Sequence, residues 1–257
     1  MIEIEGLVKS YGRFPVLRGI DLRIPASRVT ALVGPNAAGK TTLVKAVLGL
    51  IRPDGGRTVV AGVGVGDGPS YRERIGYMPQ HPAFPDNLRV RELIEFVDGL
   101  RGVEPGDADS RFARRPDSAP LDLFDLRGSL DKRLGTLSGG TAQKVNAALA
   151  FRYGADLLIL DEPTAGLDPL SRTRLKDLIR RERERGATVL VTSHVLSELR
   201  DLAENLVYLV DGRKRFEGGT TDLLRTMETD DLERAVARLM EADAAEPDRN
   251  ASTREAS

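Results

Sequence analysis

The chain has 257 residues, of which 40% are hydrophobic and 30% charged, and its formal net charge is −1. This near balance of basic and acidic residues gives no overall positive field, so nucleic acid is not an expected partner. The lack of cysteine excludes disulfides, zinc–thiolate sites and thiol redox chemistry. No apolar run approaches the roughly 18 residues that a membrane-spanning helix needs, and the start, MIEIEGL, does not have the pattern of a signal peptide. We therefore expect a cytoplasmic α/β protein.

The first quarter of the chain has the pattern of strands around a glycine-rich turn. Alternating segments at residues 2–8, 16–24 and 57–61 predict an antiparallel β lobe. The apolar run at residues 29–33 predicts a buried strand of a parallel sheet, and TTLVKAVLGL from Thr41 predicts the helix that follows it. The turn that joins this strand to this helix reads GPNAAGKTT.

That turn fits the phosphate-binding pattern G-x-x-x-x-G-K-(S/T) through Gly34, Gly39, Lys40 and Thr41. A strand, a glycine-rich turn and a helix place successive backbone N–H groups and the positive end of the helix around a phosphate. Lys40 adds a positive charge, and the Thr41 hydroxyl is a ligand for Mg²⁺. A chance glycine-rich turn is the alternative, which only further motifs in the right order exclude. The other residues of the predicted cradle are Pro35, Asn36, Ala37, Ala38 and Thr42.

Two further motifs lie in the second half of the chain. The sequence LSGG starts at Leu137, and LLILDEPTAGLD covers residues 157–168. The apolar run of the second motif ends in Asp161 and Glu162, as expected of a buried strand that delivers acids to a phosphate and its Mg²⁺ at its carboxyl edge. Residues 188–192 predict another buried strand, and His194 follows it.

Helical patterns occupy the middle of the chain. Residues 89–102, 121–128 and 141–153 predict three helices, the last of which directly follows LSGG. The segment 102–118 is rich in Gly, Pro, Asp and Arg, so it predicts a mobile connection between the first two helices.

The pattern changes beyond Gly219. Leu232, Val236, Leu239 and Met240 recur at helical spacing, which predicts an amphipathic helix that docks on its own domain or on a neighbour. The final residues are polar and predict a disordered tail. The sequence contains no internal repeat and no second cradle, so it predicts one half of a dimer and not a fused pair.

With its cradle, LSGG and LDEP motifs in this order, the chain resembles the nucleotide-binding subunit of ATP-binding cassette (ABC) transporters over about residues 1–220. The resemblance implies an α/β fold: a P-loop NTPase core with a mostly parallel sheet, an antiparallel β lobe and a helical lobe inserted at about residues 87–151. Residues 221–243 would form a C-terminal helical extension and residues 244–257 a disordered tail. The resemblance also implies that the chain binds ATP and hydrolyses it with Mg²⁺.

The resemblance assigns roles to the residues of the cradle and of the LDEP motif. Lys40 would bind the nucleotide phosphates, and Thr41 and Asp161 would hold Mg²⁺. Glu162 would be the general base that polarises the attacking water. The alternative for Glu162 is a strand-end acid that faces solvent.

Two residues outside these motifs resemble further members of the active site. Gln80 resembles the glutamine that touches Mg²⁺ and the water and reports the nucleotide state to the membrane partner. His194 resembles the histidine that contacts the terminal phosphate. The alternatives are a turn residue for Gln80 and a structural strand-end histidine for His194.

The resemblance also implies a site shared between two chains. Tyr11 would stack on adenine, although a tyrosine beside a glycine is as easily a turn residue. Asp168 would couple the two sites, and as an Asp before Pro it also predicts a helix N-cap. Ser138, Gly139 and Gly140 would close over the nucleotide of the opposite subunit, because they cannot also wrap the phosphate that their own cradle holds. We expect a head-to-tail homodimer that buries two ATP molecules.

Two residues depart from the family pattern. Ala37 replaces a glycine of the cradle, and a Cβ there costs about 1 kcal/mol if the backbone needs a positive φ. Thr141 follows LSGG where glutamine is commonest. Neither change removes a catalytic group, so the sequence predicts an active and slower enzyme.

The sequences GGTAQKVNAALAF and IGYMPQHPAFPDNL resemble the ATPase of the nitrous-oxide reductase maturation system, which is linked to copper-site assembly. This implies an integral membrane permease and a periplasmic accessory protein as partners, and a peripheral position on the inner face of the membrane. Phe84 and Leu88, shortly after Gln80, lie where contact with the permease is expected. The alternatives are the ATPase of a multidrug or lipid exporter and a soluble ABC ATPase without a transport role.

Overall fold

A sheet of six strands lies at the centre of the molecule, with the order β10-β9-β3-β8-β7-β6. The computed structural model describes residues 1–102 and 116–245. Neighbouring strands from β9 to β6 run parallel, and only β10 pairs antiparallel with its neighbour. The strands are β3 (Val29–Val33), β6 (Ile75–Met78), β7 (Leu157–Asp161), β8 (Thr188–Thr192), β9 (Asn205–Val210) and β10 (Arg213–Gly219).

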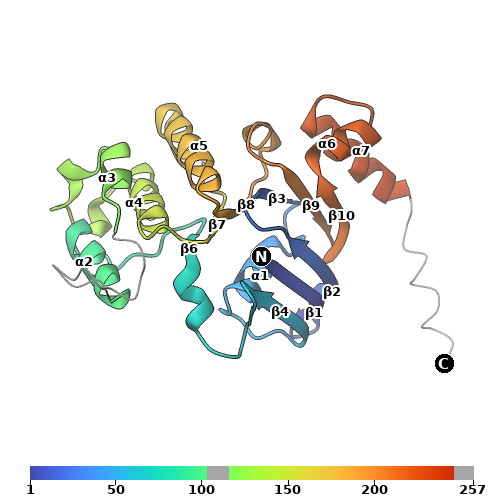
Figure 1. Cartoon of the computed structure of the whole chain (residues 1–257), viewed down its shortest axis with the longest axis horizontal. Helices are drawn as coiled ribbons and strands as arrows, with labels where there is room; N and C mark the ends of the chain where they lie inside the picture. The colour runs from blue at the N-terminus through green and yellow to red at the C-terminus, as the bar shows by residue number, and fades with distance from the viewer. Residues whose placement is uncertain (103–115, 246–257) are drawn as a thin grey trace.

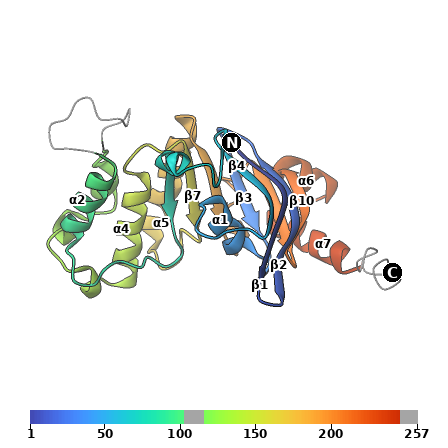
Figure 2. The same ribbon diagram turned by 90° about the horizontal axis from the view of Figure 1, so that it is seen from below.

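A second sheet, antiparallel and of four strands, packs beside the first (Figures 1 and 2). The helix α1 (Lys40–Val47) lies between the two sheets, and its buried face joins one core with both of them. The prediction of an antiparallel β lobe beside a parallel sheet is therefore confirmed. Its strands are β1 (Ile2–Tyr11), β2 (Phe14–Ile24), β4 (Gly55–Val60) and β5 (Val63–Gly64).

Alternation along the strands of the large sheet divides the hydrophobic residues between two cores. In β7, for example, Leu157 and Ile159 face α1, whereas Leu158 and Leu160 face the helices on the other side. Those helices include α4 (Gly139–Phe151) and α5 (Pro169–Glu184), which pack against the sheet face that α1 leaves free. Both faces are thus covered, which explains why β3, β7 and β8 are buried at every residue.

The helices α2 (Val90–Leu100), α3 (Ala119–Leu123) and α4 gather at one end of the molecule (Figure 1). The predicted helix at residues 121–128 is wrong: α3 ends at Leu123, and a 3₁₀ turn follows at Arg127–Ser129. The reason is Asp125, whose φ of 54° takes the chain out of the helix. The helix predicted at residues 141–153 begins two residues earlier, because Ser138 caps it.

Two helices, α6 (Thr220–Thr226) and α7 (Leu232–Ala245), follow the last strand at the opposite end (Figure 1). The amphipathic pattern predicted α7, and its Leu232 and Val236 are buried in this chain's own core, while Met240 is exposed. The helix α7 continues past residue 244, where the tail was predicted to begin. The rest of that tail and most of the predicted connection at residues 102–118 lie outside the described residues.

The carboxyl ends of the parallel strands lie at one edge of the large sheet, because the strands share one direction. The cradle follows β3, Gln80 follows β6, Asp161 ends β7 and His194 follows β8. In open α/β sheets this edge is where ligands bind. Within the part of the chain that the structure covers, no helix has the length and apolar character needed to span a membrane.

Candidate functional site

The turn after β3 leads into the N-terminus of α1, and the Ala38 nitrogen donates to the carbonyl oxygen of Pro35 within it at 3.2 Å. Gly39, at the N-cap of α1, has a φ of 101°, and a Cβ there would lie 2.8 Å from Leu17 Cδ2, so glycine is required. No side chain caps α1. Its first backbone donors and the positive end of its dipole therefore remain available to an anion.

Ala37 has a φ of 65°, in the left-handed region, where a Cβ is sterically unfavourable. The substitution of the usual glycine therefore leaves a strained residue in the cradle. Strain of this kind is tolerated where the surrounding structure fixes the backbone, and here strand β3 and helix α1 fix both ends of the turn.

Lys40 turns back onto the cradle in this structure. Its Nζ donates hydrogen bonds to the carbonyl oxygens of Gly34 at 2.6 Å and of Pro35 at 2.9 Å. Burial lowers the pKa of Lys40, and the nearby carboxylates of Glu162 and Asp161 oppose this effect. The ammonium group therefore lies among the cradle carbonyls and near both acids of the LDEP motif.

Asp161 and Glu162 are linked through Thr192, at the end of the neighbouring strand β8. The Thr192 hydroxyl donates to Asp161 Oδ1 and accepts a hydrogen bond from the Glu162 backbone nitrogen at 3.0 Å. Asp161 is only 3% exposed, and burial raises the pKa of its carboxyl group. Thr192 thus fixes the Asp161 carboxylate and the backbone of Glu162, a role that the sequence analysis missed. The signal available in the sequence was a hydroxyl residue at the end of the strand that precedes His194.

Glu162 lies on a strained backbone and faces His194. Its φ is 49°, in the left-handed region, and such outliers occur at functional sites because the surrounding structure has to hold them. Glu162 Oε2 lies 2.8 Å from His194 Nδ1, within hydrogen-bond distance. The Glu162 side chain is mostly buried, whereas the His194 side chain is 64% exposed. The histidine therefore orients the carboxylate and still faces the open side of the site.

One open cavity of about 580 Å³ unites most of the predicted site. It brings together the cradle, both acids, Gln80 and His194, which come from the ends of four parallel strands. Gly34 and Pro35 do not line it, but their carbonyl oxygens accept the hydrogen bonds from Lys40 Nζ. The lining residues are Val16, Asn36, Ala37, Ala38, Gly39, Lys40, Thr41, Thr42, Gln80, Asp161, Glu162 and His194.

Tyr11 does not line this cavity. It ends β1 on the outside of the four-stranded sheet, is 47% exposed, and has Lys9 Nζ 5.6 Å from its ring centroid. Its exposed ring is accessible to an adenine base, but no contact between Tyr11 and the cradle places the ring beside a nucleotide. The proposed stacking on adenine stays a prediction.

The LSGG residues also lie away from the cavity of their own chain. Ser138 is the N-cap of α4: its Oγ accepts from the Thr141 backbone nitrogen at 3.2 Å and lies 2.8 Å from Thr141 Oγ1. Gly139 and Gly140 are the first residues of the helix; a Cβ on Gly139 would meet no atom within 4 Å, whereas a Cβ on Gly140 would lie 3.0 Å from the carbonyl oxygen of Gly166. Thr141 therefore replaces the usual glutamine with a hydroxyl that binds the capping serine.

Asp168 has two structural roles in this chain. Its carboxylate caps α5 by accepting from the Ser171 backbone nitrogen at 2.9 Å, as predicted. It also forms an ion pair with Lys144 Nζ at 2.7 Å, so it connects α4 to α5. The hydrogen bonds from Lys144 and then from Ser171 lower the pKa of Asp168. Lys144 was not predicted, because nothing in its spacing distinguishes it from a surface lysine.

The oxygen groups of the cavity suit Mg²⁺. Thr41 offers a hydroxyl, Asp161 a buried carboxylate whose second oxygen Thr192 leaves free, and Gln80 an amide oxygen. Hard oxygen ligands of this kind, completed by phosphate and water, are the usual environment of Mg²⁺. Among the described residues no group of three His, Cys, Asp or Glu side chains could hold a metal without such additional ligands.

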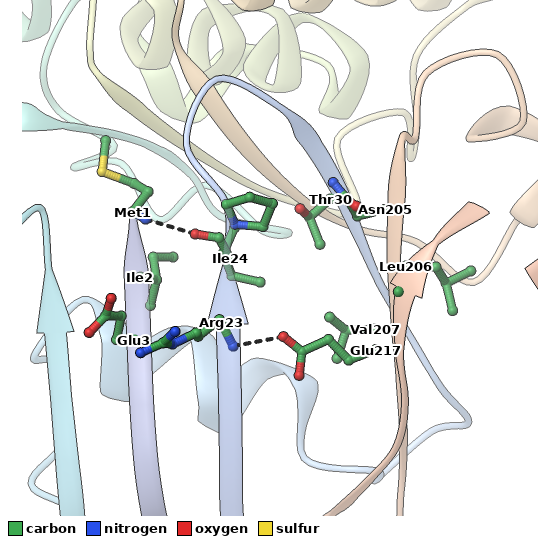
Figure 3. A pocket seen from close by; sticks show the side chains of 12 residues that line it. Met1, Ile2, Glu3, Arg23, Ile24, Thr30, Asn205, Leu206, Val207 and Glu217 are labelled. Atoms are coloured by element: carbon green, nitrogen blue, oxygen red, sulfur yellow. Dashed lines mark hydrogen bonds between the residues drawn. The ribbon is translucent and has the colours of Figure 1, made fainter. Parts of the chain in front are cut away.

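A second cavity, of about 370 Å³, lies between the two sheets (Figure 3). Thr30 and Asn205, neighbours in register on β3 and β9, face it, and Thr30 Oγ1 and Asn205 Nδ2 have no hydrogen-bond partner among the described residues. The Arg23 backbone nitrogen donates to Glu217 Oε1 at 2.9 Å on its other side. This cavity lies toward the amino ends of the parallel strands, away from the edge that carries the cradle and the acids.

Comparison with known proteins agrees with this geometry. The family model described as "ABC transporter" matches residues 17–165, more than half of the chain. The daunorubicin/doxorubicin resistance ATP-binding protein of Streptomyces peucetius is 37% identical over 223 residues, which cover 86% of this chain and 66% of that protein. The Nod factor export ATP-binding protein I of Burkholderia orbicola (strain AU 1054) is 34% identical over 88% of this chain and 73% of that protein.

The chain thus spans about two thirds of the length of the curated relatives it matches. A solved structure of an ATP binding subunit of an ABC transporter superimposes with a TM-score of 0.84 and 28% identity, over 93% of this chain and 99% of that one. The fold, the cavity and these relatives lead to one conclusion. The chain belongs to the ABC transporter family, as an ATP-binding subunit that hydrolyses ATP.

Proposed function

We propose that the chain hydrolyses ATP with the residues that line the cavity at the carboxyl edge of the large sheet, and that residues 1–220 form this ATPase unit. The observation that carries the proposal is the meeting of the cradle, Asp161, Glu162 and His194 in one cavity, although they lie far apart in the sequence. A carboxylate pair, a lysine and free helix N–H groups at one point are the requirements of phosphoryl transfer.

Each group has a distinct role in the proposed reaction. The cradle N–H groups and Lys40 bind the β- and γ-phosphates, and for this the ammonium group exchanges the carbonyl oxygens of Gly34 and Pro35 for phosphate oxygens. Thr41, Asp161 and Gln80 would hold Mg²⁺, which would neutralise negative charge on the phosphates. Glu162 accepts the proton of the attacking water as the new bond to phosphorus forms and ADP leaves. His194 orients Glu162.

The test is the release of phosphate from Mg-ATP by the wild type and by Glu162→Gln. The substitution keeps the shape of the side chain but removes the base, so we expect a loss of about 100-fold or more in kcat with nucleotide binding retained. Glu182→Gln is the matched control, since Glu182 is a buried glutamate whose carboxylate pairs with Arg185 on α5, outside the cavity. Equal rates for wild type and Glu162→Gln would contradict the assignment of the base.

We further propose that a second copy of the chain completes each site. Ser138, Gly139 and Gly140 begin a helix, as an anion-binding surface requires, yet they do not line the cavity of their own chain. A head-to-tail twin would bring this surface over the γ-phosphate and make ATP the link between the two copies. ATP would then favour the closed dimer, and hydrolysis would release it.

The proposed partner in the membrane is a permease that docks beside the segment after Gln80. A cavity of about 440 Å³ lies there, lined among others by Pro79, His81, Phe84 and Tyr153. Phe84 is half-buried against the core. An apolar cavity between the strand that leads to Gln80 and the helices α2 and α4 suits a short helix of a partner. The chain would then lie on the inner face of the membrane through this contact.

For the transported substrate we propose export of a small molecule. The support is the similarity to ATP-binding proteins named for daunorubicin/doxorubicin resistance, linearmycin resistance and Nod factor export. The nitrous-oxide reductase maturation system, with its periplasmic accessory protein, stays a prediction from short sequence segments alone. Purification of the chain from membranes distinguishes these functions. Co-purification with a multi-span permease alone supports export, and co-purification with a permease and a periplasmic protein supports the maturation system. Co-purification with ribosomes and no permease would contradict both.

A further inference from the structure

The helix α4 buries two amide side chains beside the segment that leads to Gln80. Gln143 and Asn146 are 3% and 4% exposed. Asn146 Nδ2 donates to the carbonyl oxygen of Pro79 at 2.8 Å and lies 3.4 Å from Gln143 Oε1. Gln143 Nε2 is buried and has no hydrogen-bond partner among the described residues. Because buried amide groups are costly unless they are fully bonded, this pair is not arranged for stability alone.

The bond from Asn146 acts directly on the backbone of Gln80. The strand β6 ends at Met78, so the Pro79 carbonyl is the first one beyond its last residue. The Pro79 carbonyl and the Gln80 nitrogen belong to one peptide unit, which is planar and rigid. Holding the carbonyl oxygen therefore sets the orientation of the chain as it enters Gln80, which lines the cavity with Asp161 and Glu162.

The other end of the same helix carries the LSGG residues. Ser138 caps α4, and Asn146 follows about two turns later, roughly 12 Å along the axis. A continuous α-helix moves as one body over this length. A shift at Gln80 that pulls on Asn146 is therefore transmitted to the surface that would close over the nucleotide of the twin.

Asn146 also lies at the proposed docking cavity. Asn146, Pro79 and Phe84 all line it, so a partner seated there meets the same hydrogen bond. The hydrogen bond from Asn146 to Pro79 therefore connects the docking cavity, the residue Gln80 at the reaction site, and the helix α4 that begins at the LSGG motif.

We propose that Asn146 is a positioning residue that couples Gln80 to the helix α4, through its hydrogen bond to Pro79. The inference rests on the proposed function, because it acts through Gln80. The Asn146 side chain does not line the ATP cavity and touches no reacting atom. It acts by fixing the peptide before Gln80, and the loss of its N–H donor leaves Gln80 displaced.

The test is a double-mutant cycle on kcat for ATP hydrolysis by the whole chain. We expect Asn146→Ala to lower kcat about fivefold, which is the effect of losing one neutral hydrogen bond, with the KM for ATP within about twofold of wild type. In a Gln80→Ala background the same substitution should lower kcat less than about twofold, since the residue that it positions is gone. Asn146→Leu, similar in volume and without a donor, should behave in the same way and covers the case in which the alanine variant does not fold.

The control is Asn205→Ala, which removes another asparagine whose Nδ2 is buried, at the cavity between the sheets. Any effect it has should multiply with that of Gln80→Ala, as for independent sites. Multiplying effects for both Asn146 variants, or no effect from either alone, would overturn the inference. A failure of the proposed function is distinguishable, because Glu162→Gln would then hydrolyse ATP as fast as wild type.

Discussion

At the scale of single residues, Thr192 and Lys144, which are not among the predicted site residues, hold Asp161, Glu162 and Asp168 in place. The sequence predicted Lys40, Asp161 and Glu162 from their place in motifs, and the structure brings them to one cavity. Thr192, which bonds to the Asp161 carboxylate and the Glu162 backbone nitrogen, and Lys144, which pairs with Asp168, went unpredicted. The motifs contain the residues that contact the ligand. Thr192 and Lys144 act through contacts between elements, and their spacing along the chain does not reveal these contacts.

Asp161 gives a prediction about stability. Burial raises the pKa of its carboxyl group above that of the unfolded chain, so the folded state holds this proton more tightly and stability falls as pH rises through that range. Asp161→Asn cannot ionise and keeps an oxygen for Thr192. We expect it to raise the Tm of the nucleotide-free chain at pH 7 by about 2–4 °C, the shift that about 1 kcal/mol gives at this size.

The control for this prediction is Asp98→Asn. Asp98 Oδ2 pairs with Arg152 at 2.9 Å, and Asp98 Oδ1 accepts from the Tyr153 hydroxyl at 2.7 Å. Asp98→Asn removes the charge that pairs with Arg152, so this variant should have a lower Tm than wild type. The gain from Asp161→Asn should shrink as the pH approaches about 4, where the unfolded chain also becomes protonated. Scanning calorimetry without Mg²⁺ measures both variants, and a lower Tm for Asp161→Asn at pH 7 would refute the account of its burial.

At the scale of elements, strands were predicted better than helix ends. Runs such as Val29–Val33 and Thr188–Thr192 are mostly apolar and buried at every residue, because the sheet is covered on both faces, and their bounds match the structure. The helix at residues 121–128 failed because Asp125 takes a positive φ, which asparagine-like residues adopt without a clear sequence signal. The helical extension expected at residues 221–243 is divided into α6 and α7, and the sequence did not indicate this division because seven residues are too few for a distinct period.

The segment between β6 and α2 gives a prediction about coupling. Phe84→Asp places a charge in the proposed docking cavity, so it should abolish stimulation of ATP hydrolysis by the permease that co-purifies with the chain. Basal hydrolysis should stay within about twofold, because Phe84 does not line the ATP cavity. Phe96→Asp is the matched control: Phe96 is 58% exposed on α2, outside the docking cavity, and its substitution should change neither rate.

The outcome that would contradict this prediction is full stimulation by the permease in the Phe84→Asp variant. Leu88→Asp, four residues further along, tests how far the proposed contact extends, since Leu88 is half-buried against the core but does not line the docking cavity. Circular dichroism and the Tm of each variant separate a loss of docking from a loss of folding.

At the scale of the whole molecule, the fold separates the LSGG residues from the cavity that holds the cradle and the acids. The large sheet brings the cradle and the acids to one edge, while α4, which gathers with α2 and α3 at one end of the molecule, begins with the LSGG residues (Figure 1). The sequence predicted this separation from a resemblance. The structure gives the physical basis of this separation: α4 begins at Ser138, and Ser138 does not line the cavity of its own chain.

The central claim is that each catalytic site takes its cradle from one copy and its LSGG surface from the other. It is tested most directly by mixing two inactive variants, Glu162→Gln and Ser138→Arg, and measuring phosphate release. In a mixed dimer one site has both defects and the other has neither, so we predict recovery of up to about a quarter of wild-type activity in an equal mixture. A mixture as inactive as its two components, with mixed dimers present by mass spectrometry, would contradict the claim.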